Sequence, residues 1–292
     1  MKIFNSDILI KKTSCNCADL PGHQIPPSVN LFVKVTKGCN AHCAFCSNAG
    51  CQSPTSLFDI EKMIRIIYEL KSKGIIVNRM NITGGEPSVV SPLVVRILDA
   101  IDKEHFDDVH LHLNTNGVTM QAQDLMQHPR WDSISMSLHH YDINRLSDLY
   151  GCEIPAHLFH FTGVDKQKIN FSCNLIKGYI DNKEEVRKML DLTLDTGIRR
   201  IGFVALMPVN SFCKDHFIDI DDIPFAEIPH VYFTGAKDRG TDCKCSNYLY
   251  NKELRILEIY MRNYANPQYC ESSLVYDGAY LRQGFYNNNI IY

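Results

Sequence analysis

The sequence lacks three features that would each restrict the class of protein: a long apolar run, a cluster of basic residues and an internal repeat. The N-terminal stretch MKIFNSDILIKK has Asp7 within its apolar part, so it is too short and too polar for a signal peptide or a membrane span. The net charge is −3 and the 30 Lys and Arg residues are scattered, which gives no general attraction for nucleic acid. We therefore expect a cytoplasmic protein that binds neither a membrane nor nucleic acid.

Cysteine, by contrast, is abundant, with 12 residues among 292. In a reducing compartment these cysteines are not expected to form disulfides, so metal binding or burial must account for them. With 45% hydrophobic and 22% charged residues, the chain can bury a sizeable core. Its length suits one large domain with a small addition.

Short apolar or β-branched segments alternate with helix-like segments over most of the chain. The expected strands cover residues 30–36, 78–83, 108–114, 133–138, 169–176 and 201–207. The expected helices cover residues 57–74, 91–104 and 183–197. This alternation predicts an α/β fold with a parallel sheet or partial barrel, whose functional site lies at the C-terminal ends of the strands.

The alternation stops near Pro208, and the composition then becomes rich in Asp and Pro. We expect an N-terminal extension over 1–29, a core over 30–210 and a different, smaller unit over 211–292. Near its end, Asp277 and Gly278 predict the turn of a β-hairpin.

Three cysteines follow the first expected strand at close spacing. Cys39, Cys43 and Cys46 form a Cys-x3-Cys-x2-Cys loop, in which one turn can direct three thiolates at one point. An iron–sulfur cube accepts three thiolates and leaves one iron open, whereas zinc normally takes four protein ligands. The spacing favours an open iron. A zinc site completed by Cys51 or His42, or three buried thiols, is the alternative.

The stretch ITGGEP, residues 82–87, ends the second expected strand. Gly84 and Gly85 allow backbone groups to approach a ligand without interference from a Cβ atom, and Glu86 adds a carboxylate that can accept from an ammonium group. A lone Gly-Gly-Glu commonly marks a plain turn. One strand after a three-cysteine loop, it indicates a cofactor site.

The stretches CNAHCAFC and TGGEP, in this order on successive strands, resemble the radical S-adenosylmethionine (SAM) enzymes. NTNG, SLHHYD, NLIKGYID and FVALMPVN extend the likeness to the subfamily that includes the GTP cyclase of molybdopterin biosynthesis, over about residues 30 to 210. The resemblance implies a partial (β/α)6, TIM-like barrel with a 4Fe–4S cluster whose open iron binds SAM. It also implies an external electron donor, such as flavodoxin or ferredoxin, and cleavage of SAM to methionine and a 5′-deoxyadenosyl radical.

The resemblance assigns roles to individual residues. It makes Cys39, Cys43 and Cys46 the cluster ligands. The expected SAM contacts are Phe45, Thr83, Gly84, Gly85, Glu86, Asn114, Ser137 and Met207. Strand-end polar residues also cap helices and Met commonly fills a core, so several of these contacts have a structural alternative. Lys177 matches a lysine that binds substrate phosphate in the GTP cyclase, although a lone Lys before a turn is commonly solvated.

Other positions depart from the GTP cyclase. Asn81 and Phe32 stand where that enzyme has arginines, of which the one at the Asn81 position grips GTP. The paired glycines at that family's C-terminus are also absent, because this chain ends in NNNIIY. GTP is therefore not the expected substrate.

The C-terminal cysteines resemble an auxiliary-cluster extension of the SPASM or Twitch type. Cys243, Cys245 and Cys270 are the expected ligands of a second iron–sulfur cluster, with Cys213 or a substrate as the fourth. The usual Cys-x2-Cys spacing is replaced by Cys-x-Cys, and Gly284 stands where a later cysteine is found. A zinc site or unligated thiols are the alternative.

Two histidine pairs complete the candidates. His139 and His140 follow the end of an expected strand, and we expect one of them, His139 foremost, to contact substrate or hold a proton. His110 and His112 share one face of another strand, where they point either into a barrel lumen or into surface or core.

We therefore expect an enzyme that abstracts a hydrogen atom from a bound substrate. The missing GTP arginines and the auxiliary cluster favour a ribosomally made peptide; a nucleoside, sugar or other small molecule is the alternative. An iron–sulfur carrier or metal-stapled binding module without turnover is the alternative of another class. The Gly-Gly-Glu stretch argues against a carrier, which has no need for it.

Overall fold

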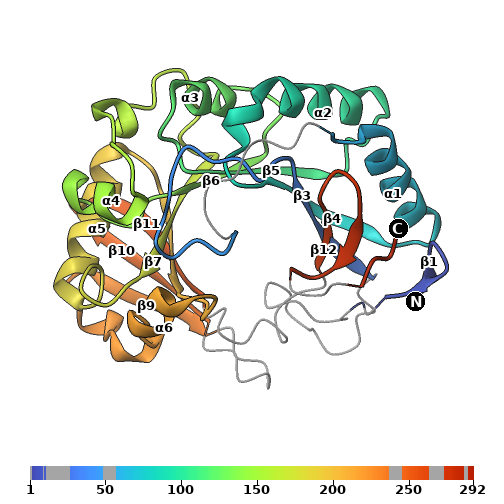
Figure 1. Cartoon of the computed structure of the whole chain (residues 1–292). Helices are drawn as coiled ribbons and strands as arrows, with labels where there is room; N and C mark the ends of the chain where they lie inside the picture. Colours follow the sequence, from blue (N-terminus) through green and yellow to red (C-terminus); the bar gives the residue numbers. More distant parts are fainter. Residues whose placement is uncertain are drawn as a thin grey trace.

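The computed structural model describes residues 2–8, 10, 27–48, 57–236, 245–262, 273–285 and 289–292. Its main element is one curved 11-stranded sheet in the order β13-β12-β3-β4-β5-β6-β7-β8-β11-β10-β9, with helices on its outer, convex side (Figure 1). A separate two-stranded sheet pairs β1 (Lys2–Ile3) with β2 (Ser6–Asp7). The fold is therefore α/β with a mostly parallel central sheet.

The middle of the sheet confirms the six expected strands, which are parallel and adjacent in chain order. They are β3 (Ser28–Lys34), β4 (Ile76–Thr83), β5 (His110–Thr115), β6 (Ser133–Ser137), β7 (Ile169–Leu175) and β8 (Arg200–Ala205). Successive side chains alternate between the two faces of the sheet. On β5, Leu111 and Leu113 are fully buried in the core beneath the helices, whereas His110, His112 and Asn114 face the concave side.

Helices connect these strands on the convex side. They are α1 (Ile60–Ser72), α2 (Ser91–Lys103), α3 (Met120–Met126), α4 (Ile143–Tyr150), α5 (Lys183–Thr196) and α6 (Ser211–Asp215). Short 3₁₀ turns cover η1 (Pro87–Val90), η2 (Ala156–Phe159), η3 (Ile220–Asp222) and η4 (Phe225–Glu227). The three expected helices are confirmed as α1, α2 and α5. Among the described residues, none of the helices has the length and apolar character needed to cross a membrane.

Local capping explains where these helices begin and end. The Asp59 side chain accepts from the Lys62 N–H at the start of α1, and the Asn182 side chain accepts from two N–H groups at the start of α5. Gly197 ends α5 in the left-handed conformation, with φ of 80°, which glycine adopts without strain. The sequence missed α3 and α4, which are only 7 and 8 residues long.

The strands that follow residue 210 extend both edges of the central sheet. β11 (Arg255–Arg262) pairs in parallel with β8, and β10 (Ser246–Lys252) and β9 (Val231–Ala236) continue that edge. β12 (Ser273–Tyr276) pairs in parallel with β3 and forms the expected hairpin with β13 (Leu281–Gln283). The sequence placed all of this region in one small unit, whereas hydrogen bonding joins it to two separated edges. The division of the chain at residues 29 and 210 stays a prediction.

Candidate active site

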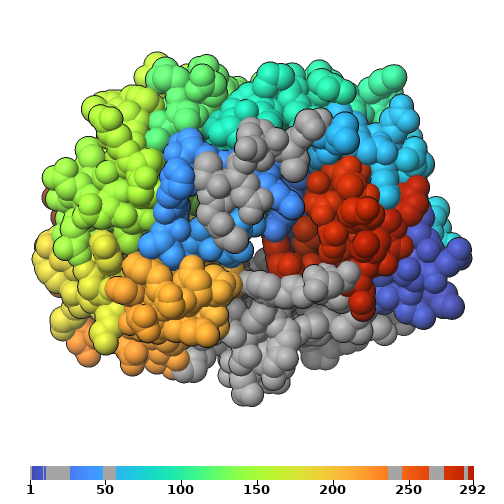
Figure 2. All heavy atoms as spheres, viewed as in Figure 1, coloured from blue at the N-terminus to red at the C-terminus, as the bar shows by residue number. Residues whose placement is uncertain are grey.

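The cysteine loop, residues 36–48, follows β3 and packs against the end of β4. The Gly85 N–H donates to the Thr36 carbonyl and the Glu86 N–H donates to the Gly38 carbonyl, each at 2.8 Å. Figure 2 shows this part of the chain, in blue, on the same face as the C-terminal hairpin, in red, and the segment around α6, in orange. The end of β4 therefore fixes the start of the loop.

The two glycines of the β4 end are required by this packing. A Cβ atom on Gly84 would lie 2.5 Å from the Thr36 carbonyl oxygen, and one on Gly85 would lie 2.0 Å from the Gly38 carbonyl oxygen. From the sequence, we expected the two glycines to let a ligand approach the backbone. In the structure, the backbone that approaches them is that of the cysteine loop.

Glu86 lies buried behind the loop, with 1% of its surface exposed. Its carboxylate accepts from the Thr115 hydroxyl and the Asn116 N–H, each at 2.7 Å, and from the Ser88 N–H at 3.0 Å. Burial raises the pKa of Glu86, while these donors oppose the rise. The residue joins the end of β4 to the end of β5.

Asn116 carries this connection on to the cysteines. Its side-chain amide donates to the side-chain oxygen Oδ1 of Asn40 at 2.9 Å and lies 4.0 Å from the Cys39 sulfur. The sequence interpretation selected Asn114 from the stretch NTNG and missed Asn116, two residues later on the same strand end. Asn114 itself faces the concave side, and so does Thr83 at the end of β4.

The C-terminus of α4 supports the middle of the loop. The His42 N–H donates to the Tyr150 carbonyl at 2.7 Å, and the Ala44 N–H donates to the Leu149 carbonyl at 3.3 Å. The last carbonyls of a helix have no partner within the helix, so the cysteine loop satisfies two of them. No motif in the sequence indicated this contact.

The three thiols of the loop are half-buried. The Cys46 N–H donates to the Cys43 carbonyl at 3.0 Å, which turns the chain between these two residues. Burial, together with the neighbouring Cys46 and Cys39 thiols, raises the pKa of Cys43 to about 12. Thiolates this close repel one another unless a bound cation compensates their charge, so this donor set suits a metal cluster.

The thiols do not yet converge on one point. Among the described residues, no group of three or more His, Cys, Asp or Glu side chains has the arrangement of a ready-made metal site. The loop thus brings the three sulfurs to one region at the C-terminal ends of the strands, and a bound cluster would have to draw them together.

A cavity of about 240 Å³ lies beside the loop. Its walls include six residues named from the sequence, contributed by the loop and by the ends of β6 and β8: Cys43, Phe45, Cys46, Ser137, His139 and Met207. These residues are separated by up to 164 positions in the chain, from Cys43 to Met207. The cavity is therefore a product of the fold, at the C-terminal ends of the strands.

His139 forms one wall of this cavity as a neutral imidazole. It is 5% exposed, and burial lowers its pKa to about 3. Its Nδ1 accepts from the Asn174 N–H at 2.9 Å, which leaves the ring proton on Nε2. The ring meets Phe45 edge to face, with centroids 4.6 Å apart. His139 thus braces the aromatic residue between the second and third cysteines.

Two other predicted substrate contacts lie elsewhere. Lys177 is exposed, and its N–H donates to the His216 carbonyl at 3.0 Å. Cys213 is fully buried in α6, where its thiol donates to the Phe45 carbonyl at 3.6 Å. Cys213 therefore packs behind the cysteine loop.

The C-terminal cysteines are only partly described. Cys245 is buried, with 2% exposed, directly before β10. Since Ser246 pairs with Met261 near the end of β11, Cys245 lies at the same end of the sheet as the end of β8. Cys243 and Cys270 lie outside the described residues, as do Cys15, Cys17 and Cys51.

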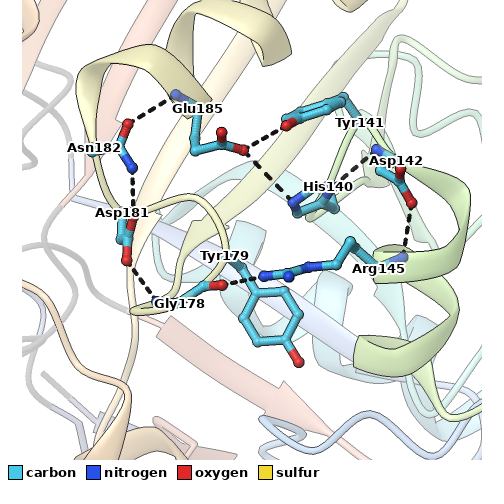
Figure 3. Close-up of a pocket in the computed structure, with 9 residues that line it drawn as sticks. All are labelled: His140, Tyr141, Asp142, Arg145, Gly178, Tyr179, Asp181, Asn182 and Glu185. Atoms are coloured by element: carbon cyan, nitrogen blue, oxygen red, sulfur yellow. Dashed lines mark hydrogen bonds and ion pairs between the residues drawn. The ribbon is translucent and has the colours of Figure 1, made fainter.

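A second pocket, of about 330 Å³, lies between the loops that follow β6 and β7 (Figure 3). The Tyr141 hydroxyl donates to Glu185 at 2.7 Å, the Asp142 N–H donates to His140 at 2.9 Å, and Arg145 donates to the Gly178 carbonyl. These hydrogen bonds between residues that line the pocket link the starts of α4 and α5. His139 and His140, adjacent in sequence, line different pockets.

The radical SAM superfamily signature matches residues 33–210. The chain therefore belongs to the radical SAM superfamily, and it is a radical SAM enzyme. Membership implies a 4Fe–4S cluster and SAM as cofactors.

Relatives named "Probable GTP 3′,8-cyclase" are similar over much of the chain. The protein of Saccharolobus islandicus strain M.14.25 is 27% identical over 253 residues, covering 84% of this chain and 77% of its own length. The protein of Saccharolobus solfataricus is 26% identical over 204 residues, covering 68% of this chain but only 63% of its own length.

Among solved structures, SuiB of Streptococcus suis bound to S-adenosylmethionine is similar, with a TM-score of 0.51 and 18% identity. The match covers 64% of this chain and 43% of SuiB. SuiB bound to its precursor peptide SuiA gives a TM-score of 0.50. These matches support the fold.

Proposed function

We propose that Cys39, Cys43 and Cys46 hold the 4Fe–4S cluster and that SAM binds in the adjoining cavity. The observation that carries the proposal is the cavity itself, which joins two of these thiols to Phe45, Ser137 and Met207. When bound, the reduced cluster supplies the electron that cleaves SAM to a 5′-deoxyadenosyl radical. An external flavodoxin or ferredoxin provides that electron.

The chain's own groups hold this arrangement in place. Of the expected SAM contacts, Phe45, Ser137 and Met207 line this cavity. Thr83, Gly84, Gly85, Glu86 and Asn114 are not among its lining residues, and their role as SAM contacts stays a prediction from the resemblance. Phe45 and His139 meet edge to face and form one wall of the cavity. Glu86 and Asn116 keep the cysteine loop seated on the ends of β4 and β5.

The radical abstracts a hydrogen atom from a substrate, which we propose is a ribosomally made peptide. Phe32 and Asn81 support this proposal, because a GTP cyclase has arginines at those positions. A small molecule is the second candidate, and the names of the relatives favour it. We further propose an auxiliary cluster on Cys243, Cys245 and Cys270. The location of Cys245 at the C-terminal ends of β8 and β11 supports it.

The experiment is anaerobic reconstitution with iron and sulfide, followed by dithionite and SAM. Wild-type protein should release 5′-deoxyadenosine, and Cys39→Ala, Cys43→Ala or Cys46→Ala should each abolish its formation. Cys152→Ala is the matched control, since Cys152 is a partly buried cysteine outside the loop. Release of 5′-deoxyadenosine by the three loop variants at the wild-type rate would refute the proposed site.

A further inference from the structure

The concave face of β4 carries two side-chain donors, Asn81 and Arg79, that have no acceptor among the described residues. Asn81 is 4% exposed, and its side-chain nitrogen Nδ2 has no partner among the described residues. Arg79 lies two residues earlier on the same face and is half-buried. No carboxylate or carbonyl in the described part of the chain pairs with its guanidinium. Buried donors in proteins are nearly always satisfied, so the Asn81 amide nitrogen points to a missing acceptor, and the half-buried Arg79 adds a positive charge beside it.

The neighbouring strand supplies neutral groups only. In the sheet register, Arg79 is opposite His110 and Asn81 is opposite His112. Burial lowers the pKa of both histidines, and the charge of Arg79 lowers both further. The two nitrogens of His112 bond Ser133 at 2.7 Å and Ser135 at 3.0 Å. The Asp132 carboxylate, just before β6, raises the pKa of His110, but it already accepts from the Leu111 N–H at 2.7 Å and pairs with Arg130 at 3.7 Å.

The strand on the other side is apolar at the level of Asn81, whereas the polar Asn30 is opposite Arg79. Phe32 is opposite Asn81 in the register of β3 and β4, and its ring meets Phe285 edge to face at 4.6 Å. Asn81 therefore lies between an aromatic ring and a neutral imidazole. No acceptor for the Asn81 amide nitrogen is found in the part of the chain that the structure describes, and a bound molecule would supply one.

We propose that Arg79 and Asn81 bind a carboxylate group of the substrate on the concave face of the sheet. A guanidinium presents paired N–H donors that match the two oxygens of a carboxylate, and the Asn81 amide adds a third donor. One positive charge balances one negative charge, so the guanidinium beside Asn81 matches a single carboxylate. The inference rests on the proposed function, in which substrate lies below the radical formed at the strand ends.

The experiment measures binding without radical chemistry. Holoprotein labelled with ¹³C in its histidines is titrated with acetate and, separately, with acetamide, inorganic phosphate and GTP at constant ionic strength. Acetate should shift the His110 and His112 resonances saturably, because the site adjoins both rings. Acetamide has nearly the same shape without the charge, so it should bind about tenfold more weakly or worse. N-acetyldiglycine and lactate then compare a peptide carboxylate with that of a small acid.

Three variants assign the effect to the proposed residues. Arg79→Met should weaken acetate binding about tenfold or more, and Arg79→Lys should restore part of it, because it keeps the charge but loses the paired donors. Asn81→Asp should also weaken acetate binding, because the new carboxylate repels acetate. Arg96→Met is the matched control, since Arg96 is exposed on α2. It should bind acetate as the wild type does.

Equal acetate binding by wild type and Arg79→Met would overturn the inference, and so would GTP or phosphate binding at this site in preference to acetate. The measurement is independent of SAM cleavage. A wild-type protein that bound acetate through Arg79 but released no 5′-deoxyadenosine would refute the proposed function and leave the carboxylate site standing. A wild-type protein that released 5′-deoxyadenosine but did not bind acetate through Arg79 would refute the carboxylate site alone.

Discussion

A Cβ atom on Gly85 would lie 2.0 Å from the carbonyl oxygen of Gly38, so the end of β4 and the cysteine loop approach each other at a distance that only glycine permits. Gly84 approaches Thr36 with similar closeness. The Gly-Gly-Glu stretch therefore shapes the cysteine loop before any cofactor binds.

Replacing Gly85 with alanine should displace the loop, because the obstacle is backbone rather than a flexible side chain. Iron bound after reconstitution and 5′-deoxyadenosine formation should both fall about tenfold or more. The matched control is Gly235→Ala on β9, where a Cβ atom would meet nothing within 4 Å. A Gly85→Ala protein with the wild-type iron content would contradict this role.

Replacing Glu86 with glutamine should destabilise the folded protein. The carboxylate accepts three hydrogen bonds, and an amide nitrogen would face one of those donors. We expect a loss of about 1–3 kcal/mol in the free energy of unfolding, measured in urea. Glu61→Gln, at a side chain 92% exposed, should change it little. Equal stability of the two variants would argue that the Glu86 network contributes nothing.

Stability should decline in acid through His112 and His139, each with a pKa lowered to about 3 by burial. Between about pH 6.5 and 3, these histidines bind protons in the unfolded chain but stay neutral in the folded chain. The stability present above pH 6.5 is therefore lost as the pH falls. Each histidine should contribute a slope of about 1.4 kcal/mol per pH unit.

Urea unfolding at pH 5 and pH 7 measures this slope. His112→Asn should reduce the difference in unfolding free energy between pH 7 and pH 5 by the contribution of one histidine. His160→Asn, at an exposed residue, should keep the wild-type difference. A wild-type protein whose unfolding free energy rose on going from pH 7 to pH 5 would contradict the prediction.

Iron content should distinguish one cluster from two. If the C-terminal cysteines hold an auxiliary 4Fe–4S cluster, the reconstituted protein should contain about eight irons per chain. Cys243→Ala combined with Cys245→Ala should then leave about four, whereas Cys152→Ala should leave the total unchanged. About four irons in the wild type would mean that the C-terminal cysteines carry no such cluster.

The sequence predicted much of the fold, for a physical reason. Buried parallel strands and amphipathic helices follow from local periodicity, so all six central strands and α1, α2 and α5 were found from short segments. The hairpin at Asp277 was found from its turn residues. The edge partners of β8 and β3 were not found, because pairing between strands far apart in the chain leaves no local pattern.

The sequence by itself determined the superfamily, since Cys39, Cys43, Cys46 and the Gly-Gly-Glu stretch lie within short, specific motifs. Only the tertiary structure decided what surrounds them. It set the cysteine loop on the C-terminus of α4, turned His139 toward Phe45, and left the Asn81 amide nitrogen buried with no acceptor among the described residues. Ligand spacing is a property of neighbouring residues, whereas an unpaired donor depends on every element packed around it.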